Sequence, residues 1–173
     1  MRDFSYRLGD LIFTRGTNLF SDVIDRFSPE IEKGFSHVAL AVSDRLAIEA
    51  VLPRVRTAII AHIIAGSPRV MVARPLFLSG KEDQLLEAAY QFHGNLYGMV
   101  TKFPGLILDS LCRTDWIAPY FSPWRSHPVC SQLVGAAYAS LKYSFGEDVW
   151  GLSPDEAAYW CQQHPTEWEA RNL

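Results

Sequence analysis

The sequence predicts an α+β fold in which an antiparallel sheet packs against a buried helix. Segments typical of β-strands gather in the first half of the chain, and segments with helical periodicity dominate the second half. Two of the strands are separated by Ser-Asp-Arg, which favours an antiparallel hairpin. The 173 residues, 49% of them hydrophobic and 20% charged, suit one globular domain over residues 1–173.

The N-terminal part should begin with a short strand at residues 9–16, where GDLIFTRG is apolar between two glycines. A helix is expected over residues 17–27, because apolar side chains recur there at i, i+3, i+4 and i+7 and a Ser-Pro pair follows. The hairpin comes next, with strands at residues 35–42 and 46–51.

Two more extended segments are expected at residues 55–64 and 69–75, although the first could instead form a short helix. Ser79, with Glu82 three residues later, resembles a capping box. The apolar spacing that follows predicts a helix that runs to about His93.

The second half is expected to be helical around a long loop. Residues 94–128 are rich in glycine, proline and aromatics, which indicates a covering loop with a short helix at LILDSLC. From Cys130, CSQLVGAAYASLKY predicts a buried helix of about four turns. Ser153, Pro154 and Glu156 predict the start of a last helix.

Composition excludes several classes of function. The net charge is −3 and no Lys/Arg block occurs, which argues against general nucleic-acid binding. No apolar run of about 18 residues is present, so no membrane span is expected. MRDFSYRLGD lacks the apolar region of a secretory signal, and a cytoplasmic location is expected unless a dedicated route exports the protein. Three cysteines without a CxxC pair indicate neither a disulfide framework nor a metal site.

The hairpin carries two polar side chains that could work together. His37 shares one face of its strand with alanines, while valine and leucine occupy the other face. An odd-length turn places His37 and Glu49 on the same face as direct or diagonal cross-strand neighbours, close enough for a hydrogen bond. The carboxylate would fix the imidazole tautomer and support its charged form. Taken singly, each also fits a plainer role, as a core histidine and a solvated strand charge.

Cys130 stands where a helix is expected to begin. The free N–H groups and the positive dipole end of a first turn favour the thiolate, and they could also hold an oxyanion. Cys130, His37 and Glu49 together would make a Cys–His–Glu triad. Tyr97 could hydrogen-bond an oxyanion or substrate, or could simply be buried. Cys112 and Cys161 lie in apolar helical patterns and are expected to pack the interior.

Four motifs in order resemble the circularly permuted NlpC-like papain-fold hydrolases, to which lecithin:retinol acyltransferases are distantly related. The motifs are Gly9-Asp10-Leu11-Ile12, Ser36-His37-Val38, Glu49 in IEA and Cys130-Ser131-Gln132-Leu133-Val134. A Gly-x-x-Tyr before the cysteine segment is also typical of the family, and Gly94 to Tyr97 fits it. In this permuted group, as here, the histidine precedes the cysteine.

The resemblance implies a papain-like domain that transfers an acyl group to water through a thioester on Cys130, without a cofactor. His37 would act as base and acid, Glu49 would hold it, and Tyr97 and Ser131 would contribute to oxyanion or substrate binding. The implied substrate is an amide in a peptide or cell-wall peptide. Two alternatives stay open: a lipid acyl hydrolase or acyltransferase, for which MVTKFPGLILDSL could be a lid, and a non-catalytic binding module.

Overall fold

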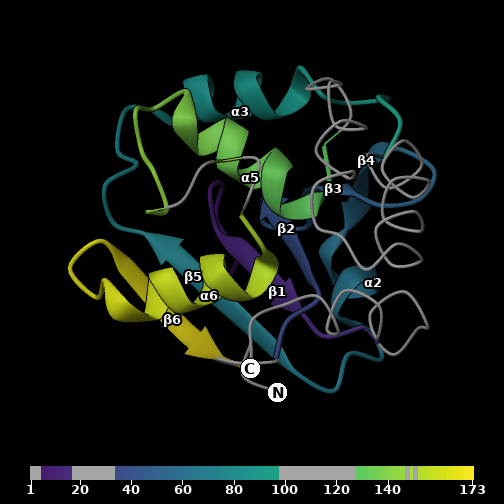
Figure 1. Cartoon of the computed structure of the whole chain (residues 1–173), viewed down its shortest axis with the longest axis horizontal. Coiled ribbons are helices and arrows are strands. Elements are labelled where there is room, and N and C mark those ends of the chain that lie inside the picture. Colours follow the sequence, from purple (N-terminus) through teal and green to yellow (C-terminus); the bar gives the residue numbers. More distant parts are fainter. Residues whose placement is uncertain (1–4, 17–33, 98–127, 147–148, 150–151) are drawn as a thin grey trace, which may run out of the picture.

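A six-stranded antiparallel sheet forms the centre of the structure, a computed structural model that describes residues 5–16, 34–97, 128–146, 149 and 152–173. The strand order is β4-β3-β2-β1-β5-β6, and each neighbouring pair is antiparallel (Figure 1). The fold class is therefore α+β, as the sequence predicts. The strands are β1 (Leu11–Thr14), β2 (His37–Ala41), β3 (Leu46–Ala50), β4 (Val55–Ile59), β5 (Val70–Pro75) and β6 (Trp168–Asn172).

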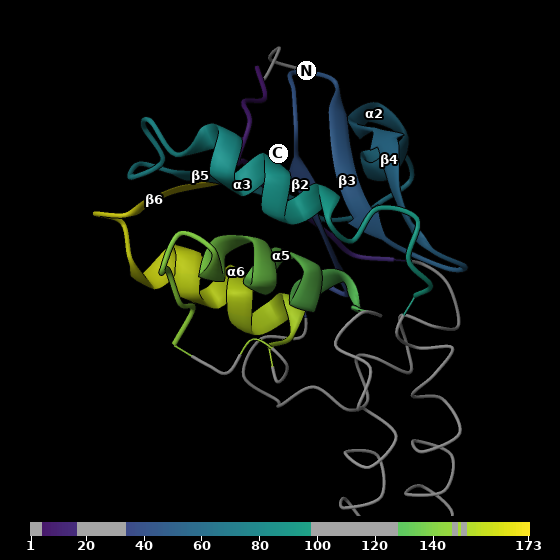
Figure 2. The ribbon, with the colours of Figure 1, turned by 90° about the horizontal axis from the view of Figure 1, so that it is seen from above.

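Helices cover the two faces of the sheet unequally. The larger apolar core joins one face of the sheet to α3 (Glu82–Tyr90), α5 (Cys130–Ala139) and α6 (Pro154–Gln163). The smaller core lies on the other face, where α2 (Ile60–Ile64) packs over the alanines of β2 and β3. Figure 2 shows α5 and α6 side by side below the sheet and α2 beside β4. None of the helices in the described ranges has the length and apolar character needed to span a bilayer.

The helix α5 is the most deeply buried of these helices, as its small and apolar sequence predicts. Leu133, Val134 and Tyr138 have no exposed surface, and burying a side chain of this kind stabilises the fold by about 1.5–3 kcal/mol. The Tyr138 hydroxyl donates a hydrogen bond of 2.6 Å to the carbonyl oxygen of Gly9, just before β1. The helix is thereby fixed against the centre of the sheet, where it contacts β2 and β3.

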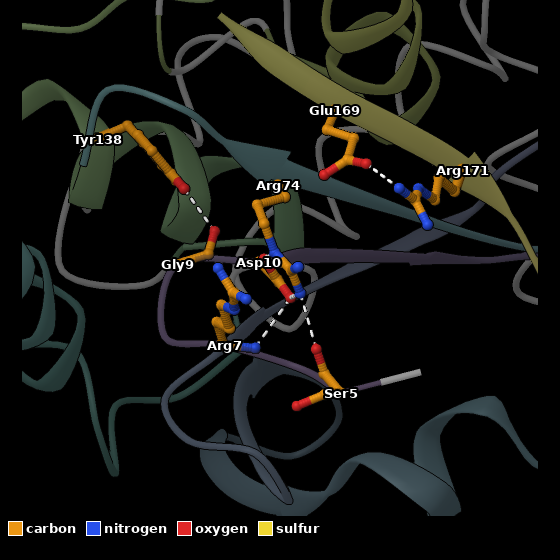
Figure 3. A network of polar contacts seen from close by, with 8 residues as sticks. All are labelled: Ser5, Arg7, Gly9, Asp10, Arg74, Tyr138, Glu169 and Arg171. Carbon is orange, nitrogen blue, oxygen red and sulfur yellow. Dashed lines mark hydrogen bonds and ion pairs between the residues drawn. The ribbon is translucent and has the colours of Figure 1, made fainter. Parts of the chain in front are cut away.

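A buried ion pair ties the beginning of β1 to β5 (Figure 3). Asp10 has no exposed surface. Its Oδ1 accepts from Nε of Arg74 at 2.9 Å, and its Oδ2 accepts from Nη2 at 2.7 Å. The same Oδ2 accepts the backbone N–H of Arg7 at 2.9 Å, and Nη2 of Arg74 also donates to the Ser5 carbonyl at 2.7 Å. The aspartate of the opening Gly-Asp motif therefore satisfies backbone and guanidinium donors at a strand start.

Most predicted elements are present within the described residues. The hairpin of β2 and β3 forms, and β1 and β5 lie within the segments expected for them. The α6 helix begins with the predicted capping box, in which the Ser153 hydroxyl accepts the Glu156 N–H at 3.2 Å and the Glu156 carboxylate accepts the Ser153 N–H at 2.7 Å. The helix expected over residues 17–27 and the LILDSLC helix lie outside the described residues.

Two predictions in this part of the chain need correction. Residues 55–64 form both of the structures considered, the strand β4 and then the helix α2. The capping box at Ser79 is wrong, because α3 begins at Glu82 with Lys81 as its N-cap and no side chain caps it. Gly80, at a φ of +77°, turns the chain before that helix.

The C-terminal part differs in two further ways. The α5 helix ends at Ala139, about one turn earlier than expected, and Lys142 then adopts a φ of 60°, in the left-handed region. The strand β6 was not predicted, because its sequence, WEARN, is mostly polar. It lies at the edge of the sheet, where one side of a strand faces solvent and polar residues are tolerated.

Replacing Asp10 with alanine should lower the free energy of unfolding by about 3–5 kcal/mol, because the substitution leaves the Arg74 charge without its buried partner. Urea denaturation measures the loss. The matched control is Asp44→Ala, which removes a carboxylate that is 70% exposed and paired with Arg45; its cost should be about 0.5 kcal/mol or less. Equal losses in the two variants would contradict a structural role for the buried pair.

Candidate active site

The strands β2 and β3 part at one end of their hairpin. β2 and β3 pair at Leu40 with Ile48 and at Ala41 with Ala47. Beyond those residues, β2 stays paired with β1 as far as His37, and β3 stays paired with β4 as far as Ala50. His37 and Glu49 both lie in the part of the hairpin where the strands diverge, and this divergence makes room for side chains from another element.

His37 and Glu49 form the hydrogen bond expected from the hairpin. Extending the β2–β3 register places Glu49 opposite Ala39, so His37 is a diagonal neighbour. Nε2 of His37 lies 2.9 Å from Oε2 of Glu49. The imidazole is partly buried and the carboxylate almost completely so, with 18% and 5% of their side chains exposed. The predicted contact is confirmed.

Arg56 completes this carboxylate's set of partners. It lies directly opposite Glu49 in the β3–β4 ladder. Both Nε and Nη2 of Arg56 lie 3.0 Å from Oε1 of Glu49. Burial alone would raise the pKa of Glu49, but the hydrogen bonds and charges of His37 and Arg56 outweigh burial, and the pKa falls below its ordinary value. Glu49 is therefore a carboxylate at neutral pH.

Cys130 is the first residue of α5, as predicted. The side-chain oxygen of Gln132 accepts the backbone N–H of Val129 at 3.2 Å, which is the back-reaching half of a capping box. This contact fixes where the helix begins. The packing of α5 on β2 then carries the Cys130 side chain to the open end of the hairpin, close enough to His37 to raise the pKa of the imidazole. The structure thus brings the three predicted triad residues together.

Several polar groups lie close enough to the Cys130 thiol to act on its ionisation. They are the His37 ring, the backbone N–H groups of Val38 and Ser131, and the Tyr97 side chain. Burial raises the pKa of the thiol, whereas His37 and the two N–H groups lower it, and the balance lies below the ordinary value. The site therefore favours the thiolate.

The histidine shows the opposite balance. Burial lowers the pKa of His37, but hydrogen bonds and charge from Cys130 and Glu49 raise it to about 9. Since Nε2 faces Glu49, Nδ1 is the ring nitrogen left for the sulfur. A doubly protonated ring satisfies both neighbours, so the site favours a thiolate–imidazolium pair backed by a carboxylate.

Backbone hydrogen bonds beside the edge strand β4 hold Tyr97 close to Cys130. Its backbone N–H donates to the Pro53 carbonyl at 2.9 Å, and the preceding Asn95 carbonyl accepts the Val55 N–H at 2.8 Å. Tyr97 is 6% exposed. Burial and the Cys130 charge both raise the pKa of its phenol, so it stays a hydrogen-bond donor at neutral pH.

Ser131 plays a different role in the site from that of Cys130. Its hydroxyl is buried and donates to the Leu152 carbonyl, which ties the first turn of α5 to the chain before α6. Its backbone N–H faces the Cys130 sulfur. A contribution of Ser131 to oxyanion binding would therefore come from its main chain rather than its hydroxyl.

The other candidate residues fall outside the site or outside the described part of the chain. Cys161 is buried in the core, and burial raises the pKa of its thiol, as expected for a packing residue. Cys112 lies outside the described residues. Within the described ranges, no group of three or more His, Cys, Asp or Glu side chains could hold a metal ion.

Sequence reasoning missed Arg56 and Gln132. Arg56 could have been found by extending the antiparallel register from β3 across the four-residue loop to β4, but residues 55–64 were ambiguous between strand and helix. Gln132 was noted only as a motif position, although its spacing from Val129 is the spacing of a capping box.

No protein-family model matches the chain, and no curated protein matches it with significant similarity. A nucleophile at a helix start, an imidazole beside it and a buried carboxylate behind the imidazole are the parts needed for nucleophilic acyl transfer.

The substitution Glu49→Gln should lower the pKa of His37 from about 9 toward the ordinary 6.5. The amide keeps the shape of the carboxylate but supplies no charge to stabilise the imidazolium. An NMR pH titration of the ring protons measures the change. Glu87→Gln, on the exposed side of α3, is the matched control and should leave the titration unchanged. A His37 titration that is the same with Gln at position 49 would contradict the pairing.

Proposed function

We propose that the chain is a cysteine hydrolase of the circularly permuted NlpC-like, papain-fold type that cleaves an amide bond in a peptide or cell-wall peptide. The observation that carries the proposal is the position of Cys130, at the first turn of α5, beside the hydrogen-bonded pair His37–Glu49. The order of the elements supports the fold, because the histidine strand precedes the cysteine helix and the antiparallel sheet packs on that helix.

The first step forms a thioester. The Cys130 thiolate attacks the carbonyl carbon, a C–S bond forms, and the carbonyl electron pair moves to oxygen. The N–H of Cys130 lies in the first turn of α5, where backbone donors have no intrahelical acceptor, and it can hold that oxyanion together with Tyr97. When the C–N bond breaks, the His37 imidazolium gives its proton to the leaving nitrogen.

The second step restores the enzyme. His37, now neutral, takes a proton from water as the water oxygen attacks the thioester carbon. The C–S bond breaks, the acid product leaves, and the thiolate–imidazolium pair forms again. Glu49 holds the ring in one orientation through both steps, and Arg56 holds Glu49. These steps require no cofactor.

The lining of the neighbouring groove favours a polar amide substrate over a lipid ester. The groove is bordered by the charged or hydrogen-bonding groups His37, Glu49, Arg56 and His62, alongside the aliphatic residues Val51, Ala58, Ile59 and Ile63. Recognition of an acyl chain would call for a mainly apolar channel. A comparison of muropeptides with phospholipid vesicles as substrates distinguishes an amide hydrolase from a lipid hydrolase. Cleavage of the vesicles alone would favour the lipid hydrolase.

The variant Cys130→Ala should reduce turnover of muropeptides roughly a thousandfold or more while leaving the free energy of unfolding nearly unchanged. The matched control is Cys161→Ala, which removes a buried thiol of the same size away from the site and should keep turnover. In the wild type, iodoacetamide at neutral pH should label Cys130 ahead of Cys112 and Cys161, because the surroundings of Cys130 lower the pKa of its thiol, whereas burial raises the pKa of Cys161. Near-normal turnover by Cys130→Ala would remove Cys130 from the mechanism.

A further inference from the structure

A groove of about 500 Å³ opens beside the imidazole on the side away from α5. Its walls come from β2, β3, β4 and α2, and they include His37, Glu49, Arg56, Thr57, His62 and Ile63. The volume is in the range of sites that hold a small molecule or one or two residues of a peptide. All of these wall residues belong to the described part of the chain.

The polar groups of this groove suit a carboxylate. Arg56 holds Glu49 with the edge formed by Nε and Nη2, so the Nη1 end of the guanidinium is turned away from Glu49. The Arg56 side chain is 59% exposed. The exposed His62 is a further donor among the wall residues. Glu49, the carboxylate in the wall, already accepts hydrogen bonds from His37 and Arg56. Because these two groups offset its charge, it does not oppose an incoming anion.

The groove adjoins the imidazole that would protonate the leaving group of the scissile bond. In the proposed mechanism, His37 protonates the nitrogen that departs, so that nitrogen lies next to the imidazole. The groove begins at the same imidazole and extends toward α2. The fragment that departs is therefore the part of the substrate closest to Arg56.

We infer that the groove binds the fragment released by cleavage and that this fragment carries a carboxylate held by the outer end of Arg56. The inference rests on the proposed function and deepens it. The substrate class is an N-acylated amino acid, or a peptide cleaved beside its free C-terminal carboxylate. The amide C–N bond breaks, the nitrogen takes the His37 proton, and the amino acid departs while the acyl group stays on Cys130.

Turnover of two matched substrates tests this inference. N-acetyl-Ala-Ala and its C-terminal amide differ only in the charge of the fragment released. The wild type should cleave the free acid with a kcat/KM about tenfold higher or more, as expected for charge-assisted hydrogen bonds. In Arg56→Gln the ratio of the two kcat/KM values should fall to near one. The ratio cancels any general loss that Arg56→Gln causes through Glu49. A preference for the amide, or a ratio unchanged by Arg56→Gln, would overturn the inference.

Two controls sharpen the test. Arg45→Gln makes the same substitution at an exposed arginine in the hairpin turn and should keep the wild-type ratio. Arg56→Lys keeps the charge but loses the planar fork, so its ratio should fall between those of the wild type and Arg56→Gln. A drop in the Arg45→Gln ratio equal to that of Arg56→Gln would mean that net charge, not the groove, sets the preference.

Direct binding separates a failure of this inference from a failure of the proposed function. The full chain carrying Cys130→Ala is titrated with each peptide by calorimetry, with and without Arg56→Gln. Tighter binding of the free acid that depends on Arg56, without turnover by the wild type, would support the groove and overturn the hydrolase. Turnover by the wild type with equal or undetectable binding of the two peptides would support the hydrolase and overturn the carboxylate site.

Discussion

The packing of α5 against the centre of the sheet is the constraint on which the candidate site depends. The helix begins at Cys130 and presses Leu133, Val134 and Tyr138 into the core shared with β2 and β3. The first turn of α5 therefore lies where those strands separate. The Cys130 sulfur is then close to the His37 ring and to the Val38 N–H. A helix displaced by one turn, about 5.4 Å, would take the sulfur out of hydrogen-bond range. The energetics of the core thus set the geometry of the chemistry.

The charged groups of the site alternate in sign from each neighbour to the next. The series runs from the Cys130 thiolate to the His37 imidazolium, the Glu49 carboxylate and the Arg56 guanidinium. Each buried charge has an opposite neighbour, which offsets the cost of taking it out of water. Between the ordinary pKa values of histidine, about 6.5, and cysteine, about 8.5, the unfolded pair holds one proton on sulfur. The folded pair also holds one proton, on the ring. The pair therefore adds little pH dependence to stability in that range, although it changes reactivity greatly.

Local patterns predicted the parts of the structure that local physics decides. Strand alternation and a short turn were enough to pair His37 with Glu49, because register and side-chain direction follow from the hairpin. Arg56 escaped prediction because the apolar run around it fits a strand or a helix, and only the sheet decides between them. Ser79 had the spacing of a cap but lies before a turn at Gly80. The polar edge strand β6 is held by its pairing with β5, which no local pattern reports.

The most direct test of the account is the ultraviolet absorbance of the Cys130 thiolate as a function of pH, taken as the difference between the wild type and Cys130→Ala. The account predicts that the thiolate signal appears at a lower pH than the ordinary cysteine pKa of about 8.5 would give. A signal that is absent at pH 7 and appears only as the pH rises past about 8.5 would contradict the thiolate–imidazolium pair.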